Sequence, residues 1–486
     1  MRERGQERRV GLSVRGTLHA CARGARRPAR RWLRAVGFAL AVALAAGACA
    51  PPPAPPAPAP VPPATAPAPV PPPAPEPATP QPPAPAGYGF ESEPRIEVGL
   101  RWDIEAIALE ALEPVRVTRE RDGVRAPQGE TPGPIQLTLG RGGWSAEWPG
   151  GGAKGLSTAD TLWIGATSGL DDGAARLRWS GRTWRGTFKV FVNPRGKLSL
   201  ASRLPLEAYL LGVIPGEIGR LDETLIEAGR AQAIAARSYT LFYDGRRREK
   251  EGFDLYATVE DQVYGPVESE EPLATRCVTS TRALVALSED FPIRANYSST
   301  CGGITADVWE SWPAEPLPYL RSRLDAGDGG AWCADSRHYR WVERFTVEEF
   351  ARNLRRFCPE RGVPLPRGGV GEVLDVRVTG RSRSGRVWRL EVITSTGRIT
   401  IPSHELRWVL RRAGMPGSIL RSTLIKVGVE RVRTTRAPTA ILVSGGGNGH
   451  GVGLCQTGAL GMARGGKSGL EIIEHYYSGV EVREVY

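Results

Sequence analysis

The sequence predicts an α+β protein built around one buried helix. Short runs of alternating, β-branched and aromatic residues, separated by glycine-rich turns, predict a β-rich amino-terminal portion over 95–200. The alanine-rich stretch at 222–243 predicts a helix whose small side chains allow close packing on several faces, so it should lie inside the domain. Helix and strand patterns at 346–435 predict a small α+β insertion.

Residues 1–48 have the features of a signal peptide. Residues 1–34 contain eleven arginines and two glutamates, and an uncharged apolar run follows them. A basic segment before a short apolar run is typical of an export signal and is too short for a comfortable membrane span. The run ends in LAAGAC, which resembles a lipoprotein cleavage box, so we expect a lipid on Cys49. Simple secretion, a retained anchor and a twin-arginine signal are the alternatives.

Most of the net charge belongs to this signal. The chain carries +12 in total, of which residues 1–34 carry +9, leaving +3 for the rest. A nearly balanced mature chain gives no indication of nucleic-acid binding. Residues 49–87 are mostly proline and alanine, a composition that cannot form a core and favours an extended spacer. We expect this linker to tether a folded part to a membrane.

The β-rich portion contains the strand patterns IEVGLRW, VRVTRE, IQLTL, WSAEW, RLRWS and GTFKVFV. Tryptophans recur in this region, among them Trp144, Trp148, Trp163, Trp179 and Trp184. We expect them to pack in the core or on a sheet face. Stacking on sugar rings is the alternative, because a flat aromatic face suits both roles.

The stretch LPLEAYLLGVIPGEIGRLDETLIEAGRAQAIAARSYTLFY predicts a short helix, a turn and a long helix. Pro205 suits a first helical position, where its missing N–H would lack a partner anyway. Pro215 and Gly216 should end the first helix, and Asp222 should cap the second. Glu217 then lies between the helices among apolar neighbours, where burial raises a carboxyl pKa and allows proton donation near neutral pH. A solvated turn glutamate is the alternative.

Three ordered blocks carry a family resemblance. They are LPLEAYLLGVIPGE with EAGRAQAIAARSY, then NYSSTCGGITADVWESWP from Asn296, and GNGHGVGLCQTGALGMARGG from Gly447. The chain resembles the SpoIID/LytB family, the stage II sporulation protein D type of peptidoglycan lytic transglycosylase. The resemblance implies a SpoIID-type catalytic domain over 201–486 that carries the 346–435 insertion.

The resemblance also implies a reaction with a single acidic residue. One Glu protonates the oxygen between N-acetylmuramic acid and N-acetylglucosamine, then accepts a proton from the muramyl 6-hydroxyl as a 1,6-anhydro ring closes. Glu217 stands at the matching position. Asp222 and Glu227 could supply a second carboxylate, but we expect a helix cap and a helix-face residue.

The predicted substrate-binding residues lie in the same blocks: Arg237, Ser299, Thr300, Gly302, Gly303, His450 and Gln456. Small residues in the SSTCGG loop let backbone amides approach a ligand. His450 and Gln456 can bond to sugar hydroxyls or N-acetyl groups, and Arg237 can orient a lactyl carboxylate. An ordinary tight turn, a structural histidine and a structural arginine are the alternatives. The glycines near His450 are not followed by a GK[ST] motif, so we do not expect nucleotide binding.

The cysteines leave an odd set if Cys49 is lipidated: Cys277, Cys301, Cys333, Cys358 and Cys455. In an oxidising compartment, Cys301 and Cys333 are the preferred disulfide because both flank the SSTCGG loop region. We expect no cofactor and no metal, because no short Cys/His cluster occurs. Zinc is the alternative, because some proteins of the SpoIID type bind it.

The insertion shows ordinary local patterns. Thr346 and Glu349 form a capping-box pattern before an amphipathic helix. VLDVRVTG and VWRLEVIT predict a hairpin, and HELRWVLRRAG predicts another helix.

The expected partners are peptidoglycan glycan strands, a membrane through the lipid on Cys49, and in addition an N-acetylmuramyl amidase, with no nucleic acid. The expected location is the periplasm or cell envelope. Two non-enzymatic functions are alternatives: a glycan-binding amidase enhancer and a structural envelope lipoprotein.

Overall fold

The computed structural model describes residues 87–168 and 172–486. The predicted signal peptide, the predicted lipidation site Cys49 and nearly all of the proline-rich linker lie outside these residues. No helix in the described part of the chain is long and apolar enough to cross a membrane.

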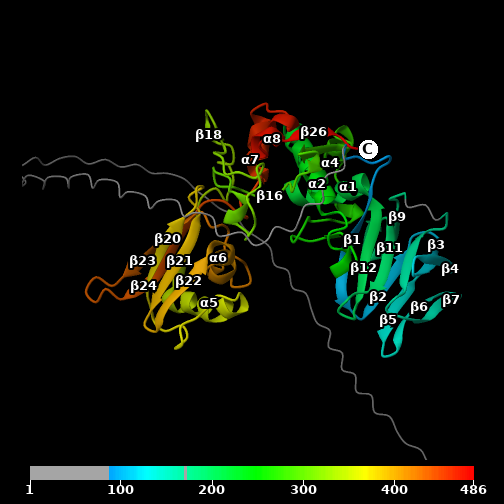
Figure 1. Ribbon diagram of the computed structural model, residues 1–486, viewed down its shortest axis with the longest axis horizontal. Helices are drawn as coiled ribbons and strands as arrows, with labels where there is room; N and C mark the ends of the chain where they lie inside the picture. The colour runs from blue at the N-terminus through cyan, green and yellow to red at the C-terminus, as the bar shows by residue number, and fades with distance from the viewer. Residues whose placement is uncertain (1–86, 169–171) are drawn as a thin grey trace, which may run out of the picture. The chain divides into compact units, whose positions relative to one another are not determined.

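Two antiparallel sheets form most of the β-rich portion (Figure 1). The seven-stranded sheet, in the order β13-β1-β12-β11-β8-β3-β4, contains β1 (Arg95–Ile104), β3 (Val115–Arg121), β4 (Val124–Thr131), β8 (Thr161–Ala166), β11 (Thr187–Val192), β12 (Leu198–Pro205) and β13 (Leu255–Tyr256), the last pairing parallel to β1. The six-stranded sheet, in the order β10-β9-β2-β5-β6-β7, contains β2 (Ala106–Ala111), β5 (Ile135–Gly140), β6 (Gly143–Trp148), β7 (Gly151–Leu156), β9 (Ala175–Trp179) and β10 (Arg182–Arg185).

Apolar side chains of both sheets belong to one continuous core. Trp144, Trp148 and Trp184 are buried in it, and Trp179 packs against it. Trp163 instead lies on the other face of its sheet, beneath the side chains of cationic residues. Packing therefore accounts for the tryptophans of this region.

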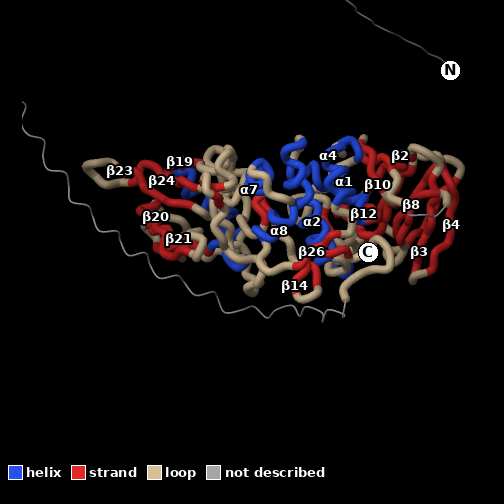
Figure 2. The backbone as a smooth tube through the Cα atoms, turned by 90° about the horizontal axis from the view of Figure 1, so that it is seen from above, coloured by secondary structure: helices blue, strands red, loops and turns tan. Residues whose placement is uncertain are grey.

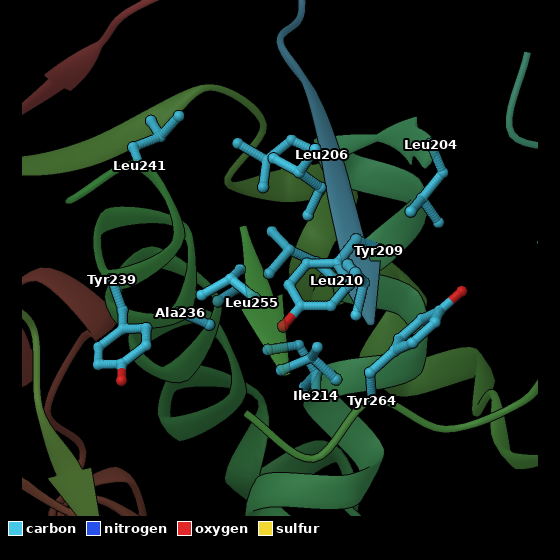
Figure 3. Close-up of a cluster of buried hydrophobic side chains, with 14 of the residues drawn as sticks. Leu204, Leu206, Tyr209, Leu210, Ile214, Ala236, Tyr239, Leu241, Leu255 and Tyr264 are labelled. Atoms are coloured by element: carbon cyan, nitrogen blue, oxygen red, sulfur yellow. The ribbon is translucent and has the colours of Figure 1, made fainter. Parts of the chain in front are cut away.

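The buried helix of the prediction is α2 (Ile226–Tyr243), and nearly every residue from Ala228 to Phe242 is buried. It contacts α1 (Leu206–Ile218), α4 (Pro272–Ser280), α7 (Gln456–Arg464) and α8 (Gly469–Tyr476). Figure 3 shows part of this packing, with leucine and tyrosine side chains of α1 beside those of α2. Short helical segments complete the region: η1 (Glu223–Leu225), α3 (Arg248–Glu251) and η2 (Val267–Ser269).

The first helix is longer than predicted. Helix α1 continues through Pro215 and ends at Ile218, before Gly219 with φ 79°. Glu217 therefore lies in the last turn of α1, not in a turn between two helices. Asp222 also differs from its prediction: its carboxylate accepts a hydrogen bond from the Thr224 amide at 2.9 Å, so it caps η1 rather than α2.

Small strands organise the segments that follow. One sheet joins β15 (Phe291–Pro292), β14 (Leu284–Ser288) and β26 (Glu481–Glu484). The strands β16 (Tyr297–Ser298) and β25 (Leu454–Cys455) pair in parallel, and β17 (Ala326–Gly327) pairs with β18 (Gly330–Ala331). In the sequence, η3 (Val308–Glu310) lies between β16 and β17. The β16–β25 pair brings the SSTCGG loop beside the carboxyl-terminal glycine-rich loop.

The insertion has its own hydrophobic core, from Trp341 to Val443, and is therefore wider than the predicted 346–435. Its elements are β19 (Trp341–Thr346), α5 (Val347–Glu360), β20 (Val373–Arg381), β21 (Val387–Thr394), β22 (Gly397–Pro402), α6 (Ser403–Leu410), β23 (Ile425–Arg431) and β24 (Pro438–Gly445). Figure 1 labels these elements except β19, which is labelled in Figure 2. The strands form the sheets β20-β21-β22 and β19-β24-β23.

Only half of the predicted capping box forms. The Thr346 hydroxyl accepts a hydrogen bond from the Glu349 amide at 3.1 Å, whereas the Glu349 carboxylate accepts from the Gly414 amide at 2.6 Å. The insertion is joined to the SSTCGG loop by Arg386, which is 1% exposed. Its guanidinium donates to the carbonyl oxygens of Cys301 at 2.9 Å and Ile304 at 3.1 Å.

Candidate functional site

A cleft of ≈650 Å³ lies where α1, the SSTCGG loop, the carboxyl-terminal glycine-rich loop and α6 of the insertion meet. Its polar lining includes Glu217, Arg247, Glu260, Asp261, Arg294, Asn296, Tyr297, Ser299, His404, Arg407, Asn448, His450 and Gln456, and its aromatic lining includes Tyr239, Tyr243, Trp312 and Trp408. The cleft therefore combines proton-donating groups with flat apolar surfaces.

Glu217 lines this cleft from the end of α1. Its Oε1 accepts a hydrogen bond from the backbone amide of Val263 at 2.6 Å, and its Oε2 accepts one from Nε2 of Gln456 at 3.2 Å. The two donors fix the carboxyl group in one orientation. Both donors come from segments that follow Glu217 in the sequence, 46 and 239 residues further along.

The close approach of α1 to the Val263 segment depends on glycine. A Cβ atom on Gly212 would lie 2.5 Å from the Gly265 oxygen, and one on Gly216 would lie 2.8 Å from the Val263 oxygen. Both distances are shorter than side chains tolerate, so hydrogen at these positions allows the two backbones to touch. Gly216 thus permits the Val263 amide to reach the carboxylate one residue further along the helix.

A buried amide holds the same segment from the other side. Gln262 is fully buried, and its Oε1 accepts hydrogen bonds from the hydroxyls of Tyr209 at 3.0 Å and Thr240 at 2.8 Å. Its Nε2 donates to the Ala236 oxygen at 3.2 Å. Because α1 and α2 both contribute partners, the position of Val263 is set by the helical core.

Burial raises the pKa of Glu217, although the hydrogen bonds from Val263 and Gln456 oppose that rise. Among the residues that the structure describes, no lysine, arginine or histidine forms an ion pair with Glu217 that would stabilise its charged form. The Tyr297 hydroxyl is buried beside this carboxyl group and also opposes the rise in the pKa of Glu217. A protonated carboxyl at this position can donate a proton to a bound oxygen.

The other carboxylates of the cleft differ from Glu217. Asp261 forms an ion pair with Arg247 and accepts hydrogen bonds from the Tyr239 hydroxyl at 3.0 Å and the Tyr256 amide at 2.9 Å. Glu260 is exposed. Asp261 is therefore occupied by protein partners, and Glu260 is open to solvent.

The predicted binding residues divide into two groups. Ser299, His450 and Gln456 line the cleft. Thr300 lies behind it, with its hydroxyl 2.9 Å from that of Ser336. Gly302 and Gly303 also lie behind the cleft, where a Cβ on Gly302 would lie 2.8 Å from the Gly446 backbone. The structure thus gives these three residues a role in packing the loops together.

His450 is neutral near pH 7, because burial, with nearby Arg407 and Arg294, lowers its pKa to about 3. Its Nδ1 accepts a hydrogen bond from the Val452 amide at 3.0 Å, and its ring lies 4.7 Å from that of Trp312. Nε2 of a neutral ring with this tautomer carries the proton and can donate it to a ligand.

Arg237 does not line the cleft, which corrects the prediction that it binds substrate. It is fully buried and donates to both carboxylate oxygens of Glu207, at 2.9 and 2.8 Å. Its third contact is to the Leu284 oxygen at 2.9 Å. These bonds join α1, α2 and β14, so Arg237 has a structural role.

Several cleft residues were not predicted from the sequence. Arg294, Asn296 and Tyr297 directly precede the SST motif, and the Nε of Arg294 and Oδ1 of Asn296 have no protein partner among the described residues. Arg407 and Trp408 come from α6. The signal that could have identified Asn296 and Tyr297 is that they begin the family block NYSSTCGGITADVWESWP. The sequence of α6 contains no comparable signal.

The predicted disulfide is not formed. Cys301 and Cys333 are free, with their Sγ atoms 3.7 Å apart. They belong to a buried group with Cys455 and Asp325, in which the four potential ligand atoms lie within 4.8 Å of one another. From the sequence, only Cys301 and Cys333 were expected to lie together, because the other members come from separate segments.

Comparison with known proteins was consistent with this geometry. A family model described as Stage II sporulation protein (SpoIID) matches residues 194–287, which include Glu217. A second model, described as a domain of unknown function (DUF8618), matches residues 329–453, which include the insertion.

Curated relatives extend the match beyond these segments. The chain is 28% identical over 301 residues to a stage II sporulation protein D of Bacillus amyloliquefaciens, which covers 58% of this chain and 75% of that protein. It is 27% identical over 293 residues to an uncharacterized protein of Brachyspira hyodysenteriae, with 60% of this chain and 70% of that protein covered. It is 26% identical over 301 residues to an amidase enhancer of Bacillus subtilis, which covers 56% of this chain and 39% of that protein.

Proposed function

Because the chain belongs to the SpoIID/LytB family, we propose that it is a peptidoglycan lytic transglycosylase in which Glu217 is the only acid/base. The observation that carries this proposal is the raised pKa of a partly buried Glu217 on the wall of a cleft. Ordinary glycosidases place two carboxyl groups across the scissile bond. Burial raises the pKa of both Glu217 and Asp261, but Asp261 forms an ion pair with Arg247, which opposes the rise, whereas Glu217 has no such partner among the described residues.

The reaction uses the two states of Glu217 in turn. The protonated carboxyl group gives its proton to the oxygen that leaves N-acetylmuramic acid. The resulting carboxylate is stabilised by the Val263 amide and Gln456, and accepts the proton of the muramyl 6-hydroxyl as the 1,6-anhydro ring closes. Gln456 suits both states, because its side-chain amide can donate to the carboxylate or, after rotation, accept from the acid.

The rest of the cleft suits a polar sugar chain. Trp312 and Trp408 offer aromatic faces, and Asn296 offers a buried side-chain oxygen that has no partner in the described part of the chain. Arg294 supplies a cation over the Trp312 ring, 5.0 Å from its centroid, where its N–H groups can donate to the lactyl carbonyl of a muramyl residue. This lining favours glycan strands of the cell wall as the substrate. The reaction would therefore take place in the cell envelope, where these strands lie.

The test is digestion of purified sacculi by the wild-type protein and by Glu217→Gln. Mass spectrometry should detect 1,6-anhydromuropeptides with the wild type. The rate of their release by the variant should be at least about 100-fold lower, because a general acid contributes a factor of this size. The matched control is Glu260→Gln, which also alters a cleft glutamate but an exposed one. Equal product from Glu217→Gln and wild type would refute the proposal.

A second candidate function is favoured by the relative named an amidase enhancer. In this function the cleft binds glycan without cleaving it, and the protein stimulates an N-acetylmuramyl amidase. The same variant separates the two, because Glu217→Gln should then retain full stimulation of the amidase, and neither protein should release anhydro products alone.

A further inference from the structure

We propose that Arg294 and Arg407 form an anion subsite in the cleft, which binds a carboxylate of the stem peptide carried by a muramyl unit. Arg294 comes from the segment before the SST motif, and Arg407 comes from α6 of the insertion. Both side chains line the cleft. The inference rests on the proposed glycan substrate but not on its cleavage, because binding alone would use the subsite.

The cleft contains more positive charge than its own residues neutralise. Another arginine of the lining, Arg247, forms an ion pair with Asp261. Arg294 and Arg407 form no ion pair with a carboxylate of the residues that the structure describes. The other carboxyl groups of the lining are the proposed acid, whose neutral form is favoured by burial, and one exposed glutamate. A cation withdrawn from water without a counter-charge costs free energy, and a bound anion removes this cost.

Arg407 is fixed along its stem and leaves its charged end available. Its Nε donates a hydrogen bond to the Leu420 oxygen at 2.8 Å, and its own carbonyl oxygen accepts one from the Leu420 amide at 2.9 Å. Its two Nη atoms have no hydrogen-bond partner within the described chain. Burial, with nearby Arg386, lowers the pKa of Arg407 to about 10, so the side chain is still charged at pH 7. Planar guanidinium donors of this kind match the geometry of a carboxylate.

Arg294 is held by an aromatic ring rather than by an acid. Its guanidinium lies over the Trp312 ring, and its Nε is buried without a partner in the part of the chain that is described. The same ring lies 4.7 Å from that of His450. The charges of Arg407 and Arg294 both lower the pKa of His450, which places the two guanidinium groups around one neutral imidazole. The subsite therefore combines two cations from separate segments with an N–H donor on His450.

The position of the subsite favours the stem peptide over the sugar ring. The pKa of Glu217 is shifted by burial and by hydrogen bonds, and neither arginine contributes to the shift. Their charges therefore lie apart from the group that gives the proton. A free lactyl carboxylate would be attached to the same ring as the scissile bond. The stem peptide extends away from this ring, so its carboxylates can reach a more distant wall of the cleft.

The subsite would make the insertion an element of substrate specificity. The insertion has its own hydrophobic core, yet α6 places one of the two unpaired cations in the cleft. Removal of the stem peptides from a glycan strand would leave these cations without their ligand. Strands that keep their stem peptides should therefore bind more tightly than strands that have lost them.

Binding to the Glu217→Gln chain tests the subsite without cleavage. The probe is a short soluble glycan fragment of alternating N-acetylglucosamine and N-acetylmuramyl peptide units, titrated by isothermal calorimetry. Adding Arg407→Gln should raise Kd at least about tenfold, because hydrogen bonds to a charged group are lost, and Arg294→Gln should do the same. Arg398→Gln is the matched control, because this arginine of the insertion is exposed and lies outside the cleft lining; its Kd should stay unchanged.

Two modified fragments identify the source of the carboxylate and need no further variant. A fragment whose peptide carboxylates are methyl esters should bind at least about tenfold more weakly than the intact fragment. A fragment whose peptides were removed by an amidase should show the same loss, although it carries free lactyl carboxylates. Equal Kd for intact and esterified fragments, tighter binding of the peptide-free fragment, or no binding of any fragment would overturn the assignment.

The outcomes separate the subsite from the proposed reaction. Binding that is weakened by esterification, together with no anhydro products from the wild-type chain, would support the subsite and refute the reaction. Anhydro products released with equal kcat/KM from intact and esterified strands would support the reaction and overturn the subsite.

Discussion

Removing the Gln456 amide should shift the pH dependence of the reaction in a predictable direction. Nε2 of Gln456 donates to the Glu217 carboxylate, so it stabilises the charged form and lowers the pKa of that group. Gln456→Met keeps the length of the side chain and deletes the donor. The pKa of Glu217 should therefore rise further, and activity that needs the protonated acid should persist to higher pH.

The size of the shift follows from the hydrogen bond. A bond to a charged group contributes roughly 1.5–3 kcal/mol, and the 3.2 Å length is greater than the usual charge-assisted distance, which favours the lower end. At about 1.4 kcal/mol per pKa unit, the expected rise is about one unit. The shorter bond from the Val263 amide remains in the variant and limits the rise.

The assay is the initial rate of anhydromuropeptide release from sacculi across a pH series, analysed as kcat/KM, which reports groups of the free enzyme. The alkaline limb should move upward by about one unit in Gln456→Met. Ser311→Ala is the control, since its hydroxyl donates to the His450 oxygen at 3.0 Å and makes no bond to Glu217. An alkaline limb at the wild-type pH, or one moved toward acid, would refute this role for Gln456.

Two further predictions concern stability. Because the folded pKa of Glu217 is raised, the folded state holds this proton more tightly than the unfolded state, so stability falls as pH rises above about 4.3, the unfolded value. Glu217→Gln should therefore have a higher unfolding midpoint than wild type at pH 7, and the difference should vanish in thermal melts below about pH 4; a difference that persists there would contradict the linkage. Arg237→Met leaves the Glu207 carboxylate without its bidentate partner and should lower the free energy of unfolding by about 3–5 kcal/mol in urea titrations. Its KM should stay at the wild-type value, and a selective rise in KM would instead favour substrate binding.

The local parts of the site could be predicted because their signals lie in one stretch of sequence. Glu217 was predicted from its apolar neighbours, and its pKa is raised by burial as expected. The alanine-rich pattern predicted that α2 is buried. The end of α1 was predicted wrongly, because proline near a helix end removes only one donor, and the packing of Gly212 and Gly216 against the Val263 segment favours the helical path.

Some strands were not predicted because they lie at sheet edges. Strand β4 contains Pro127 and Gly129, and β7 begins with two glycines, which the strand pattern does not expect. Both are the last strands of their sheets, where a missing donor or side chain is tolerated. These segments are strands because they pair with neighbouring strands, and no local sequence pattern predicts that pairing.

The cysteine group and the far wall of the cleft could not be predicted for a different reason. Cys301 and Cys455 belong to distant segments that meet only because β16 and β25 pair in parallel. Arg407 reaches the cleft from an insertion whose own sequence patterns describe only its helices and strands. Contacts of this kind depend on the tertiary arrangement.

The bond between Glu217 and Gln456 joins residues 239 positions apart. A nascent chain that has emerged only as far as Gly445 possesses the acid but lacks the partner amide and β25. Contacts of such separation form late, since long loops must close first. An interrupted product of this length also lacks the loop with Asn448 and His450, so the cleft wall is complete only when synthesis is nearly finished.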